Sequence, residues 1–288
     1  MRIPPRTLLP RTLQIASLIA CAAASGAAAQ DAPLSQSTPA APPAPAAPNQ
    51  DITVTGYNAT PVNSALPGQG AQASRIANSD SRAFLRCIKK VDPARLRPIV
   101  EGHARDPKTH DALDWVIRTQ PGCYRGAYTS PLPTSPFYGD CNPIPIGKYT
   151  VCRAVYDRGS LIEFAFNKYA PKFMLTRRDT LGKPVIERFR AREAARGKFR
   201  SPIDRKFYDV AACMVQLEPE RAIRMLRAEP GLEKEARFRK EIISKTPYCT
   251  DNAKKVQVDP YQFRVYIADA VYHWTIAAKG LETLIPTS

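Results

Sequence analysis

The most regular hydrophobic pattern in this chain lies near its C-terminus, in residues 261–278. Apolar side chains recur there at the three- and four-residue spacings of an α-helix, and further apolar residues cover most of the opposite side. Only Gln262, Asp269 and His273 form a polar stripe. A helix that is apolar nearly all round lies inside its fold. The pattern therefore predicts the central core helix of the second of two subdomains, residues 207–280.

Shorter helices are predicted in two groups. Asp92-Pro93 and Glu218-Pro219 each place an acid before a proline, which marks a helix start, because proline lacks an N–H that would be unpaired there anyway. Pro98 is expected to shorten or kink the first of these helices. The fold class that follows is all-α, with further helices expected at residues 84–90, 110–119, 147–156, 207–216 and 233–245.

Cysteine spacing indicates an internal duplication. Cys87 and Cys123 are 36 residues apart, as are Cys213 and Cys249, and the two pairs are offset by 126. Pro93, Arg95, Ile117 and Pro121 recur at the same offset, and a ten-residue gap then aligns Ala-Val-Tyr at 154–156 with 270–272. We expect two helical subdomains, 79–170 and 207–280, a basic connecting segment at 171–206 and a tail at 281–288.

The N-terminus has the pattern of an export signal. Residues 1–14 carry three arginines and no acid, a short apolar stretch follows, and Ala27-Ala28-Ala29 ends the segment. This predicts a signal peptide at 1–29, cleaved after Ala29. Alternatively, Leu18-Ile19-Ala20-Cys21 resembles a bacterial lipobox, which implies a lipidated Cys21. No other segment is long and apolar enough to be predicted as membrane-spanning.

The remaining six cysteines form an even set, which in an exported chain indicates three disulfides. If the duplication holds, the second copy can only pair Cys213 with Cys249, so Cys87 pairs with Cys123 by equivalence. Cys141 and Cys152 are then left to pair locally. None of the cysteines has the C-x-x-C spacing of zinc or redox sites, and no metal site is predicted.

Residues 30–78 are expected to form a disordered linker, because 33–67 hold eight prolines among small polar residues. Within it, Asp51-Ile52-Thr53-Val54-Thr55-Gly56 resembles the TonB box of outer-membrane receptors. The resemblance implies strand addition to a TonB-like partner. The alternative is a short β-prone island in a linker. Residues 128–149, rich in proline and aromatics, are expected to form a rigid loop.

Charge gives the main functional lead. The chain has a net charge of +16, and removal of 1–29 leaves +13. Residues 168–206 contain thirteen Lys and Arg against four acids. Residues 184–200 fit a basic amphipathic helix, which suits an anionic membrane surface, lipopolysaccharide, acidic polysaccharide or an acidic protein. The alternative is a solvated linker helix. The predicted binding residues are Arg188, Arg190, Arg192, Arg196, Lys198 and Arg200. An exported protein is not expected to bind nucleic acid.

Catalytic motifs are absent from the sequence, and no catalytic residue or cofactor is predicted. His103 and His110 lie near Asp106, Asp111 and Asp114, but Pro107 separates the histidines, so surface polar residues are the simpler interpretation. Asp269 and His273 are four residues apart and can touch, which fits a buried, satisfied histidine.

The sequence therefore favours a non-enzymatic binding or structural module that contacts an anionic envelope component. One alternative is a hydrolase-like enzyme with its site between the copies. The other is an interaction module that engages a TonB-like partner through residues 51–56.

Overall fold

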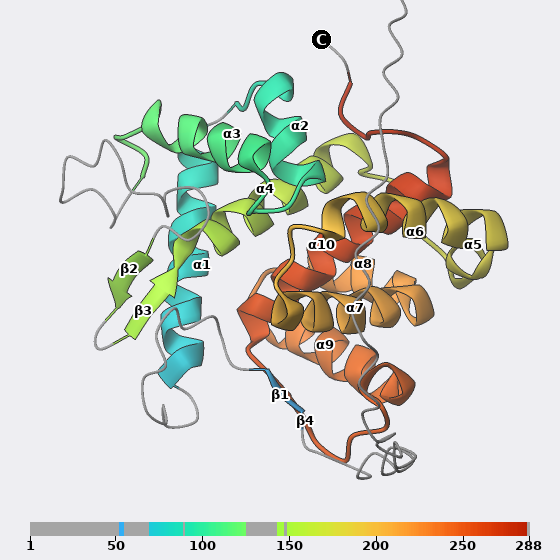
Figure 1. Cartoon of the computed structure of the whole chain (residues 1–288). Helices are drawn as coiled ribbons and strands as arrows, with labels where there is room; N and C mark the ends of the chain where they lie inside the picture. The colour runs from blue at the N-terminus through green and yellow to red at the C-terminus, as the bar shows by residue number, and fades with distance from the viewer. Residues whose placement is uncertain (1–51, 55–68, 89, 125–142, 147–148, 287–288) are drawn as a thin grey trace, which may run out of the picture. The chain divides into compact units, whose positions relative to one another are not determined.

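Helix α10 (Pro260–Lys279) is a buried core helix, as the hydrophobic pattern predicts, and it is central to the whole fold rather than to the second subdomain alone (Figure 1). Every residue from Gln262 to Ala277 is buried, and α10 contacts helices from both halves of the chain. The computed structural model describes residues 52–54, 69–88, 90–124, 143–146 and 149–286, all within one unit, Ala47–Ser288. In these residues the fold is mostly helical, which confirms the all-α prediction.

The first half of the molecule comprises four helices. They are α1 (Gln69–Ile88), α2 (Pro93–Glu101), α3 (Pro107–Arg118) and α4 (Arg153–Tyr169). Helix α1 begins well before residue 78, where the linker was expected to end. The prediction of a helix at 147–156 is wrong for 149–152, which form a strand. The helix begins after this strand, at Arg153. Pro98 does not shorten α2, which is nine residues long, as is α8 (Pro219–Arg227) in the second half.

The second half repeats this order. Its helices are α7 (Pro202–Leu217), α8 (Pro219–Arg227), α9 (Glu233–Lys245), a 3₁₀ turn η1 (Pro247–Thr250) and α10. Helix α9 begins and ends at the predicted residues. Between the halves lie α5 (Arg177–Leu181) and α6 (Lys183–Gly197). Helix α6 belongs to the core, because Phe189 stacks on Trp274 of α10 at 3.9 Å between ring centroids.

Two disulfides join equivalent places in the halves. Cys87 of α1 pairs with Cys123 after α3, and Cys213 of α7 pairs with Cys249 in η1. Both pairings confirm the sequence prediction. Cys152 is also disulfide-bonded, whereas Cys141 lies outside the described residues, so that pairing remains a prediction.

Two short sheets complete the described structure. β1 (Ile52–Val54) pairs in parallel with β4 (Val256–Val258). β2 (Pro143–Ile146) pairs antiparallel with β3 (Tyr149–Cys152). The expectation of a loop is therefore wrong for 143–146. Proline is tolerated there because a two-stranded sheet consists only of edge strands. Residues 128–142, also expected in this loop, lie outside the described residues.

The two halves share one core rather than packing separately. A single hydrophobic cluster includes Leu96 and Phe166 of the first half and Met225 and Ile267 of the second. Helices α4 and α10 cross so closely that a Cβ at Gly159 would lie 2.5 Å from Val265 Cγ2. This crossing brings the charged residues of both helices into the interior.

Charged pairs on the two sides of this crossing are reciprocal. Arg158 of α4 pairs with Asp269 of α10, and Arg264 of α10 pairs with Glu163 of α4. Each arginine also donates to carbonyls at the end of the second helix of its own half. Arg158 Nε donates to Ile99 O at 2.9 Å, and Arg264 Nη1 donates to Met225 O at 2.8 Å. Arg264 and Arg158 therefore occupy equivalent positions.

Candidate functional site

The basic helix does not present its six predicted binding residues on one outward face. Arg188 and Arg190 are exposed, and Arg188 Nε donates to Ala277 O at 2.7 Å. Arg196 and Arg200 are buried. Because α6 packs on α10, one side of it faces the interior, where its arginines meet acids. The segment 171–206 is thus a built part of the fold, not only a connection.

Asp269 is the centre of a buried charge cluster. Arg196 Nη2 donates to Asp269 Oδ1 at 2.7 Å, and Arg200 Nη2 donates to Oδ2 at 2.9 Å. Arg158 lies 3.4 Å from both carboxylate oxygens. Glu193, which bonds Arg196, and Asp204, which bonds Arg200, complete three arginines and three carboxylates. The six charges balance, as burial requires.

Two histidines join this cluster from different elements. His103, between α2 and α3, bonds Asp204 Oδ2 at 2.9 Å. His273 lies 3.3 Å from Asp269 Oδ1 one turn along α10. The expectation of a surface role for His103 is wrong, because only 7% of it is exposed. His273 is buried beside Asp269, as expected, but neither ring nitrogen has a hydrogen-bond partner among the described residues, so the expectation of a satisfied histidine is not confirmed.

Burial and the arginines set the protonation of these groups. Burial alone would raise the pKa of Asp269, but the charges of Arg158 and Arg196 hold it well below its usual range. Burial also acts against ionised Asp204, yet the His103 hydrogen bond and Arg200 lower its pKa. Burial and the Arg196 charge lower the pKa of His273 to about 4, and burial lowers that of His103. The cluster therefore holds charged carboxylates and neutral histidines at neutral pH.

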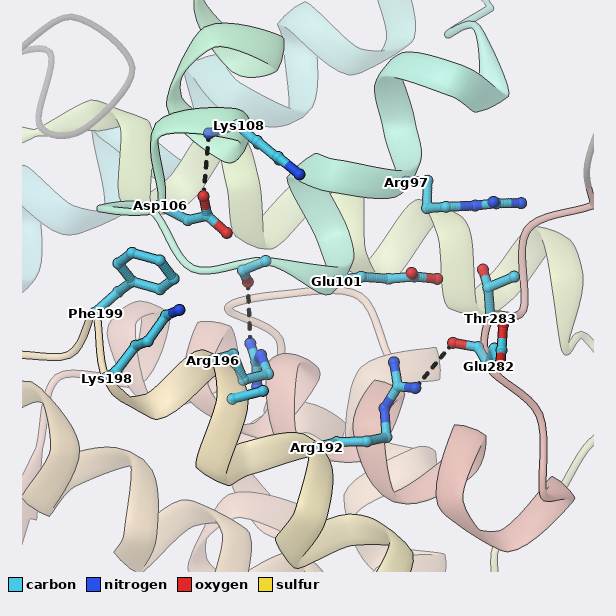
Figure 2. Close-up of a pocket in the computed structure, with 12 residues that line it drawn as sticks. Arg97, Glu101, Asp106, Lys108, Arg192, Arg196, Lys198, Phe199, Glu282 and Thr283 are labelled. Carbon is cyan, nitrogen blue, oxygen red and sulfur yellow. Dashed lines mark hydrogen bonds between the residues drawn. The ribbon is translucent and has the colours of Figure 1, made fainter. Parts of the chain in front are cut away.

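A pocket of about 710 Å³ opens beside this cluster, between α2, the start of α3, α6 and residues 282–283 (Figure 2). Small-ligand sites typically occupy 300–1,000 Å³. We call it the basic pocket, since five cationic and three acidic residues line it. The cationic residues are Arg97, Lys108, Arg192, Arg196 and Lys198, and the acidic residues are Glu101, Asp106 and Glu282.

Arg196 connects the basic pocket to the buried charge cluster. Its side chain rises from α6 toward Gly102, and Nη2 donates to Gly102 O at 3.2 Å (Figure 2). Arg158 Nη2 donates to the same carbonyl at 2.6 Å. A Cβ at Gly102 would lie 1.9 Å from Thr109 Oγ1, so only glycine permits Thr109 to pack against the backbone here. The pocket wall is therefore fixed from behind by the cluster.

The predicted tail forms another wall of the basic pocket. Leu284 and Ile285 are buried, Arg97 Nη2 donates to Ile285 O at 3.0 Å, and Arg192 Nη1 donates to Glu282 O at 2.9 Å. Sequence reasoning missed this segment and also Arg97 and Lys108. Their charges gave no local signal, since each lies outside the basic run.

Other predicted residues lie apart from the basic pocket. His110 is on α3 and contacts its neighbour Asp111 at 3.2 Å, while Asp114 pairs with Arg118. Cys21 lies outside the described residues, as do three of the six residues of the TonB-box-like segment. Its central residues Ile52–Val54 form β1, on β4 of the same chain.

The chemistry available at this site favours binding. The residues that an enzyme between the halves was expected to use, His103, Asp269 and His273, are buried and do not line the basic pocket. Among the residues that the structure describes, no group of His, Cys, Asp and Glu has the arrangement of a metal site. Cationic donors and acceptor carboxylates around a cavity can instead hold a polar, negatively charged ligand.

Comparison with known proteins gives no independent indication of function. The chain matches no family model, no curated protein and no solved structure. Within the described ranges, none of the helices has the length and apolar character needed to cross a bilayer.

Proposed function

We propose that this protein is a non-enzymatic binding module of the bacterial envelope that holds an anionic envelope component at the basic pocket. The supporting observation is the convergence of five cationic side chains, from α2, α3 and α6, on one cavity. Arg196 is held in place by Asp269 and Glu193, which also balance its charge, so it contributes a fixed hydrogen-bond donor to the lining. Lys108 and Lys198 are exposed and free to reach a ligand.

Binding to three anionic materials tests this proposal, with polygalacturonate standing in for an acidic polysaccharide. Purified protein is mixed with lipopolysaccharide, polygalacturonate or phosphatidylglycerol vesicles at low and high salt. We expect salt-sensitive binding to at least one of them, because exposed charges are screened by salt. Lys198→Glu should weaken that binding at least tenfold. Arg190→Glu, the same charge change on α6 outside the pocket, should weaken it less than threefold.

The matched pair decides between the pocket and general charge. If both variants weaken binding equally, the whole basic surface attracts the material and the pocket has no special role. If none of the three materials binds at low salt, the proposed function is wrong. Arg196 is unsuitable for this test, because its loss would leave buried carboxylates unpaired.

Export is part of the same proposal. The basic and apolar N-terminal segment and the disulfides Cys87–Cys123 and Cys213–Cys249 support an oxidising compartment. Sequencing the N-terminus of protein isolated from cells should find Gln30 first. A blocked terminus at Cys21 that Cys21→Ser abolishes would establish the lipid-anchored alternative instead.

We also propose that the two halves arose by duplication. Both halves have four helices in the same order, with equal cysteine spacing and with Arg158 and Arg264 in the same role. The equivalence places 158–163 on 264–269, an offset of 106, rather than 154–156 on 270–272. In an experimental structure, α2, α3 and α4 should superpose on α8, α9 and α10 with Arg158 on Arg264. Different helix directions would contradict a common origin.

A further inference from the structure

We infer that the ligand of the basic pocket is an anionic sugar, that is, a sugar ring bearing a carboxylate or a phosphate. This inference rests on the proposed function and names the class of ligand for the same site. Its starting point is the mixed charge of the pocket. Glu101, Asp106 and Glu282 lie among the cations, so a ligand made only of closely spaced anionic groups would meet repulsion.

Sugar hydroxyls match the acidic part of the lining. Carboxylate oxygens accept hydrogen bonds from hydroxyl donors, and a sugar ring offers several such donors. Glu101 is half-buried on α2 and accepts a hydrogen bond from Tyr272 Oη at 3.4 Å. Burial raises the pKa of Glu101, although Thr283, Arg192 and Arg97 oppose the shift. This carboxylate is therefore held in position at the cavity wall.

An apolar wall lies beside the cationic donors. Phe199 and Ala195 line the same cavity, and the Lys198 ammonium is 4.8 Å from the centroid of the Phe199 ring. In Figure 2 the Phe199 ring and the Lys198 chain rise together from the end of α6. Aromatic side chains bury apolar area at small entropic cost. A sugar whose apolar face lies against Phe199 would place its acid within reach of Lys198.

Two walls of the cavity are held by bonds that do not involve a ligand. Gly102 O accepts from Arg158 and Arg196, and the C-terminal segment is held by Arg97 and Arg192. A wall that is already fixed loses little freedom when a ligand binds. The pocket is therefore suited to a small, defined unit at the end of a chain or free in solution.

Calorimetry with matched probes tests the ligand class. The probes are trigalacturonic acid, neutral galactotriose, glucose 6-phosphate and phosphatidylglycerol vesicles. We expect trigalacturonic acid or glucose 6-phosphate to bind at least tenfold more tightly than galactotriose, and these two probes distinguish carboxylate from phosphate. Phe199→Leu should weaken the binding of the better probe about fivefold and leave the salt dependence unchanged.

Two double variants separate the pocket from the surface. Lys108→Gln/Lys198→Gln and Lys183→Gln/Arg190→Gln each remove two positive charges, but only the first pair lines the cavity. The first should weaken sugar binding at least tenfold and the second less than twofold. Equal weakening by both overturns the inference.

The probes also separate the two proposals. Binding to vesicles without binding to either anionic sugar overturns the sugar assignment and leaves the proposed function standing. Failure of all the charged probes, together with lipopolysaccharide and polygalacturonate, overturns both.

Discussion

The two reciprocal ion pairs at the α4–α10 crossing differ in what surrounds them. Glu163 accepts two hydrogen bonds from Arg264, at 2.7 and 2.9 Å, and one from Arg82 at 3.0 Å. At the other pair, Asp269 binds Arg158 and also Arg196 and Arg200, which come from α6 and the turn that follows it.

This difference shows that the Arg158–Asp269 pair belongs to a larger charge network than the Arg264–Glu163 pair. On the Arg264 side the arginine side chain is only 1% exposed. Its guanidinium pairs with Glu163 and donates to two backbone carbonyls. The Arg158 side has extra arginines and histidines and lies directly behind the basic pocket. The rear of the basic pocket therefore holds an ion pair to which Arg196 and Arg200 add two further arginines.

Removal of the two acids should sharpen this comparison most. We expect Asp269→Asn to lower the free energy of unfolding by about 3–5 kcal/mol, because it leaves three buried arginines with one fewer acid. Glu163→Gln should cost less, since one of its two arginines, Arg82, is 25% exposed and can turn toward water. Urea unfolding measures both. If the Asp269→Asn variant is as stable as the Glu163→Gln variant, then Asp269 does not stabilise more buried charge than Glu163 does.

Removal of the disulfides compares the halves at equal loop length. Both bridges close a sequence separation of 36 residues, for which chain entropy predicts about 3.8 kcal/mol each. We therefore expect Cys87→Ala/Cys123→Ala and Cys213→Ala/Cys249→Ala to lower the unfolding free energy by similar amounts. Guanidinium unfolding of the two oxidised variants checks this. A difference above about 2 kcal/mol would mean that one half depends on its bridge for packing as well as for chain entropy.

Acid should destabilise the Arg158 side through its histidines. The pKa of His273 is about 4 in the folded protein and 6.5 ordinarily, so the unfolded chain binds more protons between these values. Stability is then full above pH 6.5 and falls by about 3 kcal/mol as the pH drops toward 4. His103 adds to this fall, because its pKa is also lowered.

Thermal unfolding between pH 7 and 4 measures the effect, with His273→Gln as the comparison. The variant should show a shallower slope across that window than the natural protein. A midpoint that stays constant from pH 6.5 to 4 in the natural protein would show that His273 is not buried as a neutral group.

Much of the fold could be predicted from local signals. Proline after an acid marked α2 and α8, the apolar pattern marked α10, and equal spacing fixed both described disulfides. The start of α4 could not be predicted in the same way. The sequence pointed to a helix at 147–156, whereas a strand occupies 149–152 and α4 runs from Arg153 to Tyr169.

The site was harder to predict because its charges act over long sequence distances. Six cations within residues 188–200 are typical of an exposed face, and nothing local shows that Arg196 and Arg200 meet Asp269, 69 or more residues away. One signal was available. Arginine followed five residues later by an acid occurs at 158–163 and again at 264–269, both within apolar stretches. Buried charges require partners, so this repeated pattern predicts pairing between the two helices.

The two reciprocal ion pairs between α4 and α10 also determine when the chain can complete its folding. Arg158 and Glu163 belong to the first half, but their partners Asp269 and Arg264 lie among the last twenty-five residues. During synthesis, the first half is therefore complete before the partners of Arg158 and Glu163 exist, and burial of these two charges requires those partners. A chain cut short before residue 264 would keep its first disulfide and yet have no means to close its interior. The C-terminal helix is in this sense the final step of assembly as well as the centre of the finished molecule.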